Sequence, residues 1–129
     1  MPVDNSGLGE SVLPTEPVHM QAFIGRDPAI SDQEEFERRL FILRKVISNT
    51  IYNDEVRHAE TAGFYPASMS SRTITYKGML LATQLGDYFE DLVDPRFESA
   101  MALVHQRFST NTFPSWPLAH PYRMVAHNG

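Results

Sequence analysis

The C-terminal part of the sequence alternates apolar runs with polar loops. It reads Ala100-Met-Ala-Leu-Val-His-Gln-Arg-Phe-Ser-Thr-Asn-Thr-Phe-Pro-Ser-Trp-Pro-Leu-Ala-His-Pro-Tyr-Arg-Met-Val-Ala-His-Asn-Gly129. The first apolar run predicts a strand over 100–108, the prolines predict an ordered loop over 110–121, and a second strand is expected over 122–126. Each expected strand leads to a polar group, Arg107 in one case and Asn128 in the other.

Two polar groups in this stretch are suited to binding anions. The guanidinium of Arg107 is a planar fork of donors that matches a carboxylate, although a surface arginine at a strand end fits the same pattern. Asn128-Gly129 is a strong signal for a type I′ hairpin turn. Its functional alternative is an oxyanion hole, in which the Asn128 amide and the Gly129 backbone N–H converge on developing negative charge. On the pattern alone, the hairpin turn is favoured for Asn128-Gly129 and a surface or interface arginine is favoured for Arg107.

The composition places the chain among globular proteins. Its 129 residues suit one domain, and 42% hydrophobic with 21% charged residues are ordinary values. The net charge of −5 argues against a nucleic-acid partner. Neither a signal peptide nor a membrane-spanning segment is predicted, so we expect a cytoplasmic protein. The absence of cysteine excludes disulfides, thiolate metal sites and a cysteine nucleophile within these residues.

The clearest element expected upstream is a helix over 31–52. Ser31-Asp-Gln-Glu34 matches a capping box, in which Ser31 is the N-cap. One apolar face follows at spacings of three and four, and its members are Phe36, Leu40, Leu43, Ile47 and Ile51. Phe41, Ile42 and Val46 widen this face, which predicts a well-covered helix.

The remaining segments indicate a mixed fold. Alternating or β-branched residues predict strands over 18–24, 63–69 and 73–76, and a short helix is expected over 77–84. Together with the C-terminal strands, this order of elements indicates an α+β fold.

Histidines and aromatic residues mark the C-terminal loop and its flanks. His105, His120 and His127 invite a zinc site and a metal-dependent hydrolase, but their spacing matches no ligand pattern. Structural histidines are therefore the favoured interpretation, and no metal site is predicted. For Phe113 and Trp116, packing of an ordered loop is favoured over stacking on a ligand.

Several motifs together resemble a known family. They are Pro2-Val-Asp-Asn-Ser6, Ser70-Ser-Arg-Thr-Ile-Thr-Tyr-Lys-Gly-Met-Leu80, the run from Val104 to Trp116, Ala119-His-Pro121 and Ala126-His-Asn-Gly129. In this order they resemble the class II glutamine amidotransferase domain at the N-terminus of glutamate synthase large subunits. The likeness covers nearly the whole chain.

The resemblance implies an N-terminal-nucleophile hydrolase fold, an αββα sandwich of two β-sheets between helical layers. In that family an N-terminal cysteine attacks the side-chain amide of L-glutamine, ammonia leaves, and water releases glutamate. Carried over to this sequence, the resemblance implies that Arg107 binds the α-carboxylate of glutamine and that Thr110 lines the same pocket. It likewise implies that Asn128 and Gly129 form the oxyanion hole.

The resemblance also implies that residues 1–129 are a partial domain, without the nucleophile segment and the C-terminal part. We therefore expect a fragment of the ammonia-producing domain of glutamate synthase that is inactive alone. The alternative is a non-catalytic remnant that binds glutamine or glutamate, or that pairs with another chain. No cofactor is expected in this segment, because the FMN and iron–sulfur cluster of the parent enzyme lie on other domains. The expected partners are L-glutamine and the remainder of the large subunit.

Overall fold

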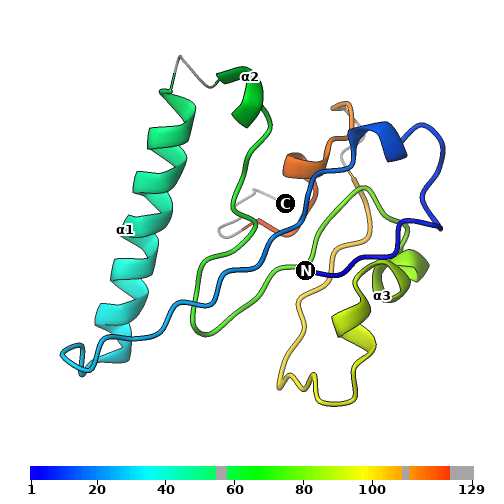
Figure 1. The fold of residues 1–129 in the computed structure, drawn as a ribbon. Coiled ribbons are helices and arrows are strands. Elements are labelled where there is room, and N and C mark those ends of the chain that lie inside the picture. The colour runs from blue at the N-terminus through cyan, green and yellow to red at the C-terminus, as the bar shows by residue number, and fades with distance from the viewer. Residues whose placement is uncertain (55–57, 109–110, 123–129) are drawn as a thin grey trace. The chain divides into compact units, whose positions relative to one another are not determined.

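The structure is a computed structural model that describes residues 1–54, 58–108 and 111–122 (Figure 1). The regular elements in this part of the chain are helices. In chain order they are η1 (Leu13–Thr15), α1 (Gln33–Tyr52), α2 (His58–Thr61), η2 (Ala82–Gln84), α3 (Leu85–Tyr88), η3 (Glu90–Val93) and η4 (Trp116–Leu118), where η denotes a 3-10 helix. The chain forms two units. The first comprises Met1–Gln21 and Tyr76–Gly129, and the second comprises Ala22–Thr75.

Helix α1 confirms the long helix of the second unit, but its cap differs from the prediction. It begins at Gln33, and the two carboxylate oxygens of Asp32 accept hydrogen bonds from the backbone N–H groups of Glu34 and Glu35. The side chain of Glu34 pairs with Arg72 instead of closing a capping box. The physical reason is that one carboxylate satisfies two of the unpaired N–H groups at a helix start, whereas a serine hydroxyl satisfies one.

The core of the second unit lies at the N-terminal half of α1. Phe36 and Leu40 are buried together with Ile30, and Met69 packs against them. Ile42 and Val46 are exposed in the structure, so the expectation that α1 is well covered is wrong. The apolar face of α1 is therefore narrower than its composition suggests.

Serine side chains fasten the segment after residue 69 to the polar face of α1. The carboxylate of Glu37 accepts hydrogen bonds from the hydroxyl groups of Ser70 and Ser71 and from the backbone N–H of Ser71. These contacts hold the pKa of Glu37 below its ordinary value, with the Ser71 hydroxyl as the main cause. Polar contacts thus complete the packing of α1 within its unit.

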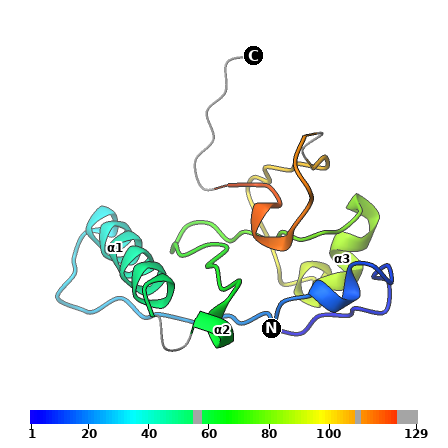
Figure 2. The ribbon, with the colours of Figure 1, turned by 90° about the horizontal axis from the view of Figure 1, so that it is seen from above.

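The first unit has an aromatic core. Tyr88, Phe89 and Trp116 are buried, and the ring of His19 meets all three edge-on with centroids 5.4–5.8 Å apart. The N-terminal segment runs alongside α3 (Figures 1 and 2). It is fixed there because the hydroxyl of Tyr88 donates to Glu16 at 2.6 Å, and the carbonyl of Tyr88 accepts from the N–H of Asp4 at 2.9 Å.

The described residues hold no strand, so the strands predicted over 18–24, 63–69, 73–76 and 100–108 are not met there. Most of the strand expected over 122–126 lies outside the described residues. The predicted helix over 77–84 begins later, at Ala82. A strand needs a neighbour that accepts its N–H groups and covers one of its faces, and local sequence supplies neither.

In the described part of the chain, no helix has the length and apolar character needed to cross a membrane.

Candidate functional site

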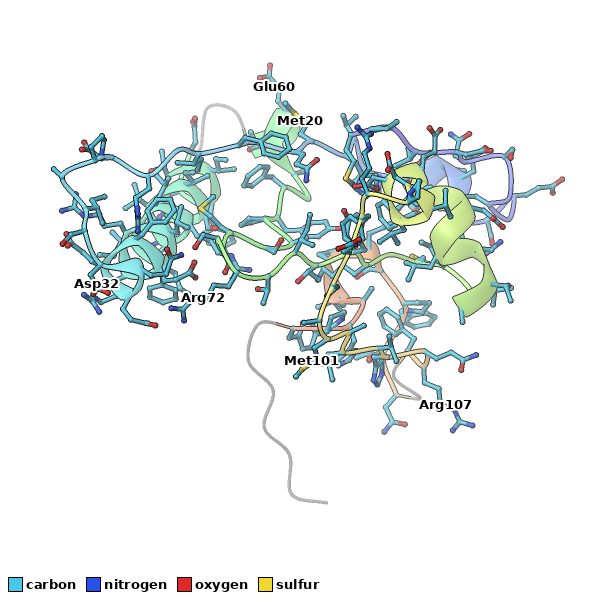
Figure 3. The ribbon with its side chains drawn as sticks, turned by 90° about the horizontal axis from the view of Figure 1, so that it is seen from below. Met20, Asp32, Glu60, Arg72, Met101 and Arg107 are labelled. Carbon is cyan, nitrogen blue, oxygen red and sulfur yellow. The ribbon has the colours of Figure 1, made fainter. Side chains whose placement is uncertain are left out.

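Arg107 lies on an exposed segment of the first unit. Residues 101–108 form no regular element, and the side chain of Arg107 extends away from the body of its unit (Figure 3). Among the arginines that the structure describes, Arg107 alone has no hydrogen bond or ion pair with a described residue. The others, each with at least one such partner, are Arg26, Arg38, Arg39, Arg44, Arg72 and Arg96. No described residue therefore occupies its five N–H donors, and a ligand can accept hydrogen bonds from them.

Arg107 is the one predicted site residue that the structure describes. Thr110, Asn128 and Gly129 lie outside the described residues. The structure therefore describes the side chain predicted to contact the carboxylate. The predicted oxyanion hole rests on the sequence alone.

A stack of rings joins the segment of Arg107 to the loop that follows. The ring centroids of His105 and His120 are 4.4 Å apart, and those of His120 and Tyr122 are 4.3 Å apart. His105 precedes Arg107 by two residues. The stack therefore ties the backbone next to Arg107 to residues 120–122.

The same loop is anchored by a buried lysine. The side chain of Lys77 is only 8% exposed, and its Nζ donates to the carbonyl oxygens of Pro117 at 2.7 Å and Ala119 at 3.1 Å. Trp116, also buried, donates from Nε1 to the hydroxyl of Thr15 at 3.2 Å. The prediction of loop packing is thus confirmed for Trp116. It is wrong for Phe113, which is 95% exposed.

Tyr76 fixes the segment that carries Lys77. Its hydroxyl donates to Oδ2 of Asp91 in η3 at 2.5 Å. Burial, followed by the effect of the Asp91 carboxylate, raises the pKa of Tyr76 well above its ordinary value. Tyr76 therefore remains a protonated donor at neutral pH and holds the start of residues 76–78 against η3.

Metal ligands and pockets define the other possible sites in the described part of the chain. It contains no group of three His, Asp or Glu side chains that converge as a metal site, and His127 lies outside it. A pocket of about 430 Å³ lies between the N-terminal segment and α3, where Gly7, Gln84 and Tyr88 are among its lining residues. Arg107 does not line this pocket.

The family model of the class II glutamine amidotransferases matches this chain over residues 1–129. The chain belongs to the class II glutamine amidotransferases. Several of its curated relatives are glutamate synthases. The chain is 45% identical over 129 residues to the glutamate synthase (NADPH) large chain of Azospirillum brasilense and 43% identical to that of Bacillus subtilis strain 168. It is 38% identical to the chloroplastic ferredoxin-dependent glutamate synthase of Spinacia oleracea.

Each of these matches covers 100% of the chain but only 8% of the relative. The class II amidotransferase chain thus spans a small part of the length of these glutamate synthases. No solved structure matches it significantly. The predicted resemblance to this family is confirmed.

Sequence reasoning did not single out Lys77 as a site residue of this amidotransferase. The residue appeared only inside the motif from Ser70 to Leu80 and at the start of an expected helix. A signal was present in the sequence, because a lysine between Tyr76 and Gly78 in an otherwise apolar segment is unusual for a solvent-facing charge. Its partners lie 40 and 42 residues away, and that distance concealed its role.

Proposed function

We propose that these 129 residues are part of the glutamine-hydrolysing domain of a glutamate synthase large chain. The match to the class II family over the whole chain and the 38–45% identity to glutamate synthases support this proposal. In the complete domain the substrate is L-glutamine and the products are glutamate and ammonia.

The proposed substrate contacts bind two anionic groups, which are the α-carboxylate of glutamine and the oxyanion formed during the reaction. Arg107 holds the α-carboxylate of glutamine by paired charged hydrogen bonds, and Thr110 lines the same pocket. The amide of Asn128 and the backbone N–H of Gly129 stabilise the oxyanion that forms when the glutamine amide is attacked. The guanidinium of Arg107, which has no partner among the described residues, is the structural observation that carries this proposal.

The attacking group in this proposal comes from outside these residues. The 129-residue sequence contains no cysteine, and a thiolate is the nucleophile that the family resemblance implies. The chain alone therefore binds substrate groups without hydrolysing glutamine. For the same reason it does not ligate an iron–sulfur cluster through thiolates. We place the cluster and the FMN on other domains of the large chain.

The sandwich fold is proposed for the complete domain. Large apolar side chains on two predicted strands are more than 80% exposed in the structure, and they are Val18, Met20, Phe23, Met101, Leu103 and Val104. Burying one such side chain stabilises a protein by roughly 1.5–3 kcal/mol. We infer that further residues of the domain cover these side chains and pair with both segments as strands. The remainder of the large chain is therefore the proposed partner.

Arg107→Ala in a complete large chain tests the carboxylate contact. We expect the KM for glutamine to rise by about 30- to 100-fold, because a charged hydrogen-bond donor is lost while the nucleophile is unchanged. The measurement is steady-state glutamate release. Arg96→Ala is the matched control, because Arg96 is an exposed arginine of the same unit that pairs with Asp94.

A second substrate makes the test specific for the carboxylate. The α-amide of L-glutamine lacks the negative charge, so its weak turnover should be nearly equal in the parent enzyme and in Arg107→Ala. An unchanged KM for glutamine in Arg107→Ala would overturn the assignment. So would an equal loss for glutamine and its α-amide.

A further inference from the structure

Lys77 is a buried charge that donates hydrogen bonds to one loop. Its Nζ donates to the carbonyl oxygens of Pro117 and Ala119, and it lies 5.4 Å from the ring centroid of Tyr122. An ammonium group taken out of water must be compensated by acceptors nearby. The position of these two carbonyl groups is therefore coupled to the burial of Lys77.

The two carbonyl groups lie just before His120 in the chain. His120 in turn stacks on His105, two residues before Arg107. A continuous set of contacts thus leads from the Lys77 ammonium through the loop backbone and the stacked imidazoles to the segment of Arg107. Every residue in this set belongs to the first unit.

The segment that carries Lys77 is itself fixed on both sides of the lysine. Tyr76 is hydrogen-bonded to Asp91. On the other side, a Cβ atom added to Gly78 would lie 2.5 Å from a ring carbon of Trp116, so only glycine permits this approach. Lys77 therefore acts from a rigid support and not from a mobile loop.

We propose that Lys77 is a positioning residue for glutamine binding, which sets the place of Arg107 through residues 117–120 and the His105–His120 stack. This inference rests on the proposed function, in which Arg107 holds the glutamine carboxylate. Lys77 touches neither the substrate nor the reacting atoms in this proposal. It fixes the loop that supports Arg107.

The first test uses Lys77→Met in a complete large chain that contains this segment. The substitution keeps an unbranched apolar side chain and removes the charged donor. We expect the KM for glutamine to rise roughly ten-fold, because a small displacement of a binding group weakens its contact strongly, while kcat stays within about two-fold. Lys45→Met is the matched control, because Lys45 is the only other lysine and is exposed on α1.

A double variant separates positioning from general structural damage. If Lys77 acts through Arg107, the effect of Lys77→Met on KM disappears in the Arg107→Ala background. If Lys77 acts elsewhere, the two effects add, and this outcome would overturn the inference. Lys77→Gln, which keeps a neutral donor, provides the same comparison if the Lys77→Met enzyme does not fold.

Fluorescence gives a readout that does not depend on activity. Trp116 is the sole tryptophan of the 129-residue chain, and the carbonyl group of its neighbour Pro117 accepts a hydrogen bond from Lys77. In the 129-residue chain, Lys77→Met should shift the fluorescence emission of Trp116 to longer wavelength, because the loop loosens and water reaches the indole. Unshifted emission would contradict the inference. An unchanged glutamine KM in Arg107→Ala would instead remove the proposed function, whatever Lys77→Met does.

Discussion

At the scale of single residues, His19 has an imidazole buried against three aromatic rings. Its Nε2 is buried and has no hydrogen-bond partner among the described residues. Burial lowers the pKa of His19 from its ordinary value of 6.5, and the nearby carboxylate of Glu16 opposes this shift. The neutral imidazole is therefore the form that fits the folded first unit.

The lowered pKa of His19 predicts that acid weakens the fold. Between the folded pKa and 6.5, the unfolded chain binds more protons at this residue than the folded chain, so the free energy of unfolding falls as the pH falls. His19→Phe keeps a ring and removes the titration. Denaturant unfolding from about pH 7.5 to about pH 5 should show the parent chain losing stability relative to His19→Phe. A pH-independent difference would contradict the prediction.

Gly78 is the second residue whose environment gives a prediction. A Cβ atom there would lie 2.5 and 2.9 Å from two ring carbons of Trp116. Gly78→Ala should therefore lower the free energy of unfolding by about 1–3 kcal/mol through overpacking. Gly9→Ala is the control, because nothing lies within 4 Å of an added Cβ at Gly9. Equal stability of the two variants in denaturant unfolding would show that the loop carrying Trp116 is not packed as described.

The site residues differ in how far the sequence reveals them. Arg107 could be proposed from residue type and neighbours, because a guanidinium has one dominant chemistry wherever it lies. Lys77 could not, because its role depends on carbonyl groups that only the folded chain brings to it. Asn128 and Gly129 remain predictions based on motif and resemblance.

At the scale of elements, α1 is the best-predicted part of the fold. Its signals are local, since apolar spacing and a polar start lie within the helix itself. The end at Tyr52 agrees with the prediction, whereas the start and the cap moved by one or two residues. Neighbouring side chains compete for the same N–H groups at the start of the helix. The spacing of residues in the sequence does not show which of them becomes the cap.

The cap of α1 gives a prediction that separates two adjacent residues. Asp32→Ala should lower the free energy of unfolding by about 1 kcal/mol, because the N–H groups of Glu34 and Glu35 lose their acceptor. Ser31→Ala, at the cap that the sequence predicted, should change it by less than about 0.5 kcal/mol. Thermal unfolding followed by circular dichroism compares the two. A larger loss for Ser31→Ala would place the cap at Ser31.

The strands show where prediction from sequence stops. Residues 100–108 have the composition of a strand, yet the described residues provide no neighbouring ladder for them. Strand formation depends on partners distant in sequence, and exposed apolar residues such as Leu103 indicate that such partners are needed. We propose that these segments become strands when they pair with the rest of a complete domain.

At the scale of the whole molecule, family membership and local geometry support one account. The class II family match covers residues 1–129. The glutamate synthase of Azospirillum brasilense is much longer, because the match covers only 8% of its length. The described structure adds an unpaired Arg107 and a loop held by Lys77. We therefore propose that substrate recognition lies in these residues and that the nucleophile lies outside them.

The most direct measurement is a crystal structure of a complete class II domain containing this segment, with glutamate bound. The account predicts that both oxygens of the α-carboxylate accept hydrogen bonds from the Arg107 guanidinium, at about 2.7–2.9 Å. A bound α-carboxylate held by other groups, with Arg107 directed into solvent, would contradict it.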